Sequence, residues 1–318
     1  MPPLEPSFDA RLADTALGQR IARGLKAPVN PAIAQFASAL AEEAGAKAVL
    51  FYGSNLRTGS LDGVLDFYVL LPGPEQSAIW PRVSYHERDF DEVTLRAKVA
   101  TMSLQTFAKA ASGALADTTI WARFVQPSAL VWVQDDEAER GTIAALSLAA
   151  TTAARLAVAL GPEEASEEDY WRGLFRATYQ AELRVEQPGR EDSILSANAA
   201  HFSGLLPLAL DAGAINHAAL SERLKITLPQ SERRAVLGWW RRRRRLGKPL
   251  NVLRLAKASV TFAGGARYAA WKIKRHSGIE VTLSPLQERF ALLAAPAFLA
   301  ALRQHRRASD KLSRNRAY

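Results

Sequence analysis

Three residues near the start of the chain have the types and spacing that phosphate chemistry uses. In FYGSNLRTGSLDGVLDFYVLL, residues 51–71, a turn begins at Gly53 and Ser54, and Asp66 stands at the mouth of the next apolar run, twelve residues after Ser54. Glycine lets the backbone approach a ligand closely, and backbone N–H groups with a serine hydroxyl hold phosphate oxygens. A carboxylate at the same edge would hold magnesium against a nucleotide triphosphate. The alternative is a plain turn, with Asp66 capping or ending an element.

Other charged residues extend this candidate site. Lys98 lies in VTLRAKVATMS, residues 93–103, where partial alternation puts it on the polar side of a strand. There it would neutralise phosphate, or else be an ordinary exposed lysine. Asp62, four residues before Asp66, is either a metal ligand or a turn-forming residue. A further acid for the metal stays open among the acids of HERDFDE: Glu87, Asp89, Asp91 and Glu92.

Short apolar runs and helical patterns must position these residues. Runs such as AVLFY and LDFYVLL, bounded by Gly and Pro, are typical of buried strands. The predicted strands are 48–52, 65–71, 93–103 and a run from Ser128, and the predicted helices are 30–46, with Gly45 as its stop signal, and a segment entered at Ser103. After about residue 137, Ala, Leu and Arg dominate and strand signals nearly vanish. We therefore expect an α+β protein, with a mixed-sheet domain over residues 1–140 and a helical domain over residues 141–318.

The composition is that of a folded protein, with 48% hydrophobic and 23% charged residues. Cysteine is absent, which excludes disulfides, a thiol nucleophile and cysteine-ligated metal centres. The N-terminus carries prolines and acids where an export signal needs a basic start and an apolar stretch, so we expect a cytoplasmic location. Two apolar segments, from Ile143 and from Phe290, contain Arg155 and Pro296 respectively, and we expect neither to span a membrane.

The net charge of +9 is unevenly distributed. Between Arg233 and Arg275 the chain has fourteen Lys or Arg and no Asp or Glu, together with Trp239, Trp240 and Trp271. Basic and aromatic residues together fit an anionic membrane surface, nucleic acid, or a solvated helix whose tryptophans pack inward. All three readings remain open from composition.

The Gly-Ser turn followed by Asp66 is similar to the nucleotidyltransferase superfamily, in which a second acid usually follows the first by two residues. Here that position holds Tyr68. YGSNLR followed by LDFYVLL instead resembles the mitochondrial-type phosphatidate cytidylyltransferases, which lack that acid. LRAKVATMSLQTF, WARFVQPSALV and TYQAELRVE resemble three later motifs of the family in the same order, covering about residues 50–190. Departures are Asn55, where the family often has Gly, Val99, where it commonly has Tyr, and a C-terminal third without a clear match.

The resemblance implies a nucleotidyltransferase-like fold and a magnesium-dependent enzyme that joins CTP to phosphatidic acid, giving CDP-diacylglycerol and pyrophosphate. Gly53 and Ser54 would cradle the triphosphate, Asp66 would bind magnesium, with Asp62 as a second candidate, and Lys98 and Arg184 would contact phosphate. The enzyme would be peripheral on the inner membrane face, brought there by the basic segment. The alternatives are a nucleotidyltransferase with a non-lipid substrate and a non-catalytic protein that binds membrane or nucleic acid.

Overall fold

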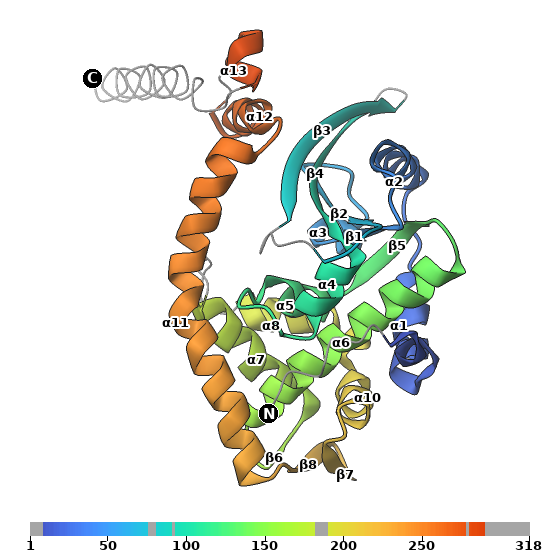
Figure 1. Ribbon diagram of the computed structural model, residues 1–318, viewed down its shortest axis with the longest axis vertical. Helices are drawn as coiled ribbons and strands as arrows, with labels where there is room; N and C mark the ends of the chain where they lie inside the picture. The colour runs from blue at the N-terminus through green and yellow to red at the C-terminus, as the bar shows by residue number, and fades with distance from the viewer. Residues whose placement is uncertain (1–8, 76–80, 91–92, 182–189, 278–279, 290–318) are drawn as a thin grey trace, which may run out of the picture.

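The computed structural model describes residues 9–75, 81–90, 93–181, 190–277 and 280–289 (Figure 1). A mixed five-stranded sheet has the order β3-β4-β2-β1-β5, in which β2 and β4 are parallel and the other pairs antiparallel. The strands are β1 (Ala48–Tyr52), β2 (Leu65–Leu71), β3 (Arg82–Phe90), β4 (Val93–Ser103) and β5 (Ser128–Val133). The expected strands 48–52, 65–71 and 93–103 have the predicted bounds.

Two layers of helix cover the sheet. The helices of the first half are η1 (Ala10–Asp14, a 3-10 helix), α1 (Ala16–Leu25), α2 (Pro31–Ala44), α3 (Ser54–Thr58), α4 (Leu104–Ala111) and α5 (Thr119–Phe124). Alternate residues of β1 and β2 point to opposite faces. On one face Phe51 and Phe67 pack with Phe36 of α2, and on the other Leu50 and Tyr68 join the core formed with the remaining helices.

Local signals explain where the predicted helices begin and end. The Asn30 side chain accepts a hydrogen bond from Ala32 N–H at the start of α2, and Gly45 ends that helix in the left-handed conformation at φ 58°. Ser103 caps α4 by accepting a hydrogen bond from the Thr106 N–H. The helices expected over 30–46 and from Ser103 are therefore confirmed.

The second half is mainly helical, which confirms the expected α+β class. Its helices are α6 (Asp136–Leu160), α7 (Glu167–Ala181), α8 (Arg190–Ala197), α9 (Ala199–Phe202), α10 (Leu205–Ala212), α11 (Gln230–Thr261), α12 (Gly265–Ser277) and α13 (Pro285–Arg289). A small sheet of order β6-β8-β7 was not anticipated, and its strands are β6 (Glu164–Ala165), β7 (Asn216–Leu220) and β8 (Arg223–Thr227). These strands are two to five residues long, too short for a clear periodic signal.

Helix α6 joins the two halves of the molecule. The expected boundary at residue 140 falls inside this helix, and one hydrophobic core runs from Leu50 and Tyr68 through Leu146 to Trp171. Among the described helices, α6 is the one that is long and apolar enough to cross a membrane. A second candidate arises only if the bent pair Glu191–Ala197 and Ala199–Ala212 is counted as a single span. However, 83% of its most apolar window is buried inside the protein, as in a core helix.

Helix α11 runs along one side of the molecule from the small sheet to α12 (Figure 1). Trp240 is buried, with its ring centre 6.2 Å from that of Trp121, and Trp239 Nε1 donates to the Gly113 carbonyl at 3.2 Å. The Arg243 guanidinium lies 4.1 Å from the Trp239 ring centre. The adjacent tryptophans of the basic segment therefore pack inward, and neither is available as a membrane anchor.

The junction between α11 and α12 covers the outer edge of β3. Tyr85 N–H donates to the Ala263 carbonyl at 2.8 Å, and the Tyr85 and Tyr268 ring centres are 5.4 Å apart. Gly264 has φ 75°, and a Cβ there would lie 2.7 Å from the Tyr85 carbonyl oxygen. Only glycine permits this close approach. The contact brings the basic helices beside the central strands.

Candidate functional site

One row of side chains crosses the sheet on the face that the helices of the second half cover. Neighbouring members are register partners on adjacent strands, and the row runs Tyr85, Lys98, Asp66, Tyr52, Ser128. Register partners point to the same face and their strands lie about 4.8 Å apart. The parallel pairing of β2 with β4 therefore places Lys98 next to Asp66, and the antiparallel pairing with β1 places the Gly-Ser turn at the same end.

Gly53 brings the turn close to the carboxylate. Its backbone lies at φ 92°, ψ −163°, and a Cβ at this position would be 3.1 Å from Asp66 Oδ2. The positive φ favours glycine, and the short distance leaves little room for a side chain. Ser54 follows as the first residue of α3 and is exposed. The buried Asn55, which departs from the family pattern, donates from Nδ2 to the carbonyls of Ser60 and Asp62 and so holds the following loop.

A cavity of about 820 Å³ opens above this end of the sheet. It is lined by four predicted site residues, Gly53, Ser54, Asp66 and Lys98. Tyr179 of α7 also lines it, which brings the later motif TYQAELRVE to the same place. The cavity has three further cationic residues: Arg57, Arg123 and Arg254. Asp66 is the sole carboxylate among its described lining residues, so the cavity favours a polyanionic ligand.

The charges of Asp66 and Lys98 are both affected by burial. Desolvation raises the pKa of Asp66, although Lys98 and Arg123 oppose the shift. Desolvation also lowers the pKa of Lys98, against the effect of Asp66, and Arg123 and Arg254 lower it further. A ligand that brings negative charge to Lys98 and positive charge to Asp66 would relieve both penalties. A metal–phosphate pair has this property.

Tyr52 is not a candidate for a general base. Desolvation raises its pKa to about 12, with Arg123 opposing and Asp66 reinforcing the shift. The Arg123 guanidinium carbon lies 5.3 Å from the Tyr52 ring centre. The phenol therefore remains protonated and holds Arg123 against the cavity wall.

Several predicted residues are not brought to the cavity. Asp62 is exposed, and it is not among the lining residues. Glu87 accepts hydrogen bonds from the Tyr85 hydroxyl and from Arg96, and Asp89 accepts one from Thr94, so both serve the β3–β4 hairpin. The other candidates, Asp91, Glu92 and Arg184, lie outside the described residues, so the structure does not place them.

Tyr68, at the position of the superfamily's second acid, belongs to the core. Its ring packs against Phe107 and Phe124 at centre-to-centre distances of 5.4 and 5.3 Å. The hydroxyl has no hydrogen-bond partner among the residues that the structure describes, and burial raises its pKa well above the ordinary value. A neutral, buried phenol is no substitute for a metal-binding carboxylate.

The donor set fits magnesium only when magnesium is shared with a phosphate ligand. The described residues contain no group of three or more Asp, Glu, His or Cys that could hold a metal ion. Magnesium often binds through one or two carboxylates, with substrate phosphates and water completing its coordination. Asp66 supplies one such carboxylate, beside three guanidinium groups and an ammonium group that suit phosphate.

Reasoning from the sequence missed the three arginines. Arg57 and Arg123 lie within quoted motifs, YGSNLR and WARFVQPSALV, and their positive charge beside a predicted phosphate site was an available signal. Arg254 had no local signal because it reaches the cavity from α11 through the contact with β3.

Comparison with known proteins found no family model that matches this chain and no curated protein similar to it. The likeness to the phosphatidate cytidylyltransferases therefore rests on the four sequence motifs alone.

Proposed function

We propose that this protein is a magnesium-dependent CTP:phosphatidate cytidylyltransferase. The observation that carries the proposal is the convergence of Gly53, Ser54, Asp66 and Lys98 on one cationic cavity. These residues come from two strands and a turn, and they are among those that the motif resemblance selects. Tyr179 adds the later motif to the same cavity.

The proposed reaction needs positioning and charge neutralisation rather than a strong base. An anionic phosphate oxygen of phosphatidic acid forms a bond to the α-phosphorus of CTP, while the bond to the β-phosphate oxygen breaks and its electron pair leaves on pyrophosphate. Bound magnesium would neutralise phosphate charge and polarise the reacting phosphorus. Gly53 and Ser54 cradle the triphosphate, Asp66 holds the cation, and Lys98 neutralises charge on the phosphates.

The outer face of α11 supports a location at an anionic membrane. Arg241, Arg242 and Arg245 are exposed there, and Leu246, Val252 and Leu253 are 46%, 55% and 58% exposed. We name these six residues the α11 outer face. Exposed apolar side chains gain from contact with lipid but not from contact with nucleic-acid phosphates, so this face favours a membrane over nucleic acid. We place the enzyme in the cytoplasm, peripheral on the inner membrane face.

The test uses the purified full-length protein with CTP, magnesium and phosphatidylcholine vesicles with or without phosphatidic acid. We expect CDP-diacylglycerol and pyrophosphate only when phosphatidic acid is present, and less product when another nucleotide triphosphate replaces CTP. Pyrophosphate release that does not depend on phosphatidic acid would point to a different acceptor. Absence of both nucleotide turnover and nucleotide binding would leave a non-catalytic binding protein. Either of these results would overturn the proposal.

A further inference from the structure

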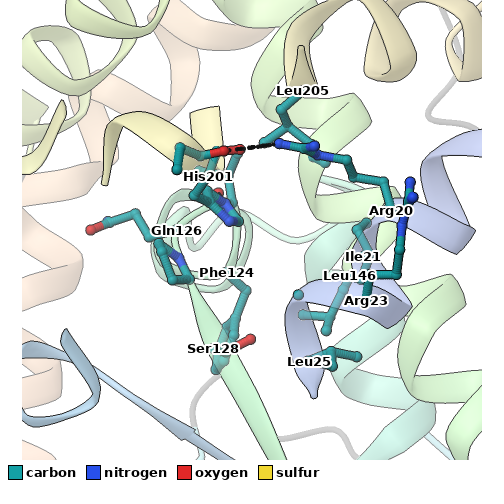
Figure 2. A pocket seen from close by; sticks show the side chains of 15 residues that line it. Arg20, Ile21, Arg23, Leu25, Phe124, Gln126, Ser128, Leu146, His201 and Leu205 are labelled. Atoms are coloured by element: carbon teal, nitrogen blue, oxygen red, sulfur yellow. Dashed lines mark hydrogen bonds between the residues drawn. The ribbon is translucent and has the colours of Figure 1, made fainter. Parts of the chain in front are cut away.

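A second cavity, of about 520 Å³, lies beside the cationic one. Figure 2 shows side chains of α1 on one side and Phe124, Gln126 and Ser128 on the other. Its apolar lining includes Ile21, Leu25, Phe124, Leu146, Ala150 and Leu205. A cavity of this size and lining has the character of a small-molecule site, where apolar walls bury most of the ligand.

The polar groups of this second cavity are largely occupied by the protein itself. Arg20 donates to the carbonyls of Ala200, His201 and Ser203 at 2.8–3.2 Å. His201 Nε2 lies 2.9 Å from the Val125 carbonyl oxygen, and desolvation lowers the pKa of the ring. The imidazole is therefore neutral near pH 7 and donates to that carbonyl. These interactions leave an interior suited to hydrocarbon.

The two cavities share a wall made of Gly24, Gln126, Pro127 and Ser128. Ser128 is the register partner of Tyr52, which is the register partner of Asp66. Two strand spacings separate Ser128 from Asp66, or about 10 Å. A ligand seated in the apolar cavity therefore has its polar end at the Ser128 side of the cationic cavity.

We propose that the apolar cavity holds the hydrocarbon part of the acceptor and that the shared wall directs its phosphate toward the cationic cavity. The occupant is an acyl chain of phosphatidic acid, because continuity with a cationic cavity selects a molecule that joins hydrocarbon to phosphate. Arg23, exposed at the rim, adds positive charge where the head group enters. This inference rests on the proposed function and adds to it a site for the second substrate.

Two substitutions test the site without removing polar contacts. Ile21→Trp fills part of the apolar cavity from a half-buried position that does not line the cationic one. Gly24→Leu adds a side chain at the wall that the two cavities share, and a Cβ at Gly24 meets no atom within 4 Å. Leucine is also the better helix former, so this variant should fold. Gln19→Trp is the matched control, because Gln19 is exposed on the same helix and lines neither cavity.

The readouts are the KM for dioctanoyl phosphatidic acid, equilibrium binding of that lipid, CTP binding and thermal melting. We expect Ile21→Trp and Gly24→Leu to raise the KM and weaken lipid binding about tenfold or more, because part of the chain loses its apolar contacts. CTP binding and Tm of Ile21→Trp should stay unchanged, and Gln19→Trp should match the wild type.

The outcomes separate this inference from the proposed function. If the wild type makes CDP-diacylglycerol and both folded variants keep the wild-type KM, the cavity is not the acceptor site and the activity stands. If the wild type binds the lipid without turnover and Ile21→Trp loses that binding, the cavity is supported and the activity fails. If the wild type neither binds the lipid nor turns it over, both proposals fall.

Discussion

At the scale of single residues, the proposed site contains a carboxylate, Asp66, that lowers the stability of the fold. Asp66 is a carboxylate whose desolvation is only partly compensated by Lys98 and Arg123, so its pKa is raised. A folded-state pKa above the unfolded value means that ionised Asp66 destabilises the fold at neutral pH. This penalty disappears as the pH falls below the unfolded value of about 3.9. Such a group is retained at a stability cost, which is typical of functional sites.

Asp66→Asn should therefore inactivate and stabilise the protein together. We expect CDP-diacylglycerol formation to fall about 100-fold or more, because the carboxylate that holds the cation is lost. The Tm should rise at pH 7, and the gain should shrink as the pH approaches about 4. Asp211→Asn is the control, because Asp211 is exposed and does not line the cavity. A lower Tm for Asp66→Asn at pH 7 would show that Lys98 and the arginines depend on this charge.

Lys98 should limit activity at alkaline pH. Desolvation lowers its pKa below the ordinary value of 10.5, so its charge is lost earlier than for a surface lysine. We expect kcat/KM to fall as the pH rises through this lowered pKa. Lys98→Arg keeps its charge at all accessible pH values and should lose this alkaline decline, whereas Lys98→Met should lose about 100-fold in activity. Persistence of the same alkaline decline in active Lys98→Arg would assign it to another group.

Much of the residue-level site was predictable from sequence because Gly53, Ser54 and Asp66 lie around one turn. Asp66 begins an apolar run and Lys98 lies in a partly alternating segment, both predicted as strands, and pairing of these strands was enough to bring the two residues together. The role of Tyr68 as a core residue was not evident, because burial of its hydroxyl depends on Phe107 and Phe124. Arg254 depends on a tertiary contact between α11 and β3 that no local pattern encodes.

At the scale of elements, strands with a local sequence pattern were predicted, and a strand that depends on tertiary contacts was missed. β1, β2 and β4 are flanked by other strands, so their apolar runs mark them. β3 lies at the sheet edge and reads RVSYHERDF, a polar sequence with weak strand character. Its outer side is covered by Ala263 and Tyr268 rather than by another strand of the sheet. An edge stabilised by distant residues leaves little trace in its own sequence.

Arg243 fixes α11 to the helices of the first half. Its guanidinium donates to the Gly113 and Leu115 carbonyls and stacks on Trp239, and desolvation lowers its pKa to about 10. We expect Arg243→Met to reduce the free energy of unfolding by about 1–3 kcal/mol, because the Leu115 carbonyl loses the guanidinium donor, while the Gly113 carbonyl keeps the bond from Trp239 Nε1. Arg243→Lys should recover only part of this, since an ammonium group cannot reproduce the planar contacts.

Chemical denaturation measures this effect, and Arg244→Met is the matched control. Arg244 is exposed, so its substitution should change the free energy of unfolding by less than about 0.5 kcal/mol. Equal losses in the two variants would mean that overall charge, rather than the Arg243 contacts, stabilises α11.

At the scale of the whole molecule, charge and exposed apolar surface coincide on one helix. The chain carries a net charge of +9, and α11 presents arginines followed by apolar side chains on its outer face. Its inner face contributes Arg254 to the cationic cavity. One helix thus connects the proposed membrane contact with the proposed site, so that a lipid substrate is taken up close to where the reaction occurs.

Binding to anionic vesicles should therefore depend on the α11 outer face and on salt. Each basic residue near such a surface contributes about 1 kcal/mol, so replacing Arg241, Arg242 and Arg245 by Gln should weaken binding by roughly 100-fold. Sedimentation with vesicles at increasing ionic strength should show a shallower salt dependence for this variant. Val252→Ser with Leu253→Ser should weaken the component that persists at high salt, because that component comes from apolar contact.

A matched variant carries three Gln substitutions at exposed basic positions elsewhere: Arg11, Arg82 and Lys225. An equal loss in the matched variant would mean that net charge alone drives association, and the α11 outer face would then have no specific role.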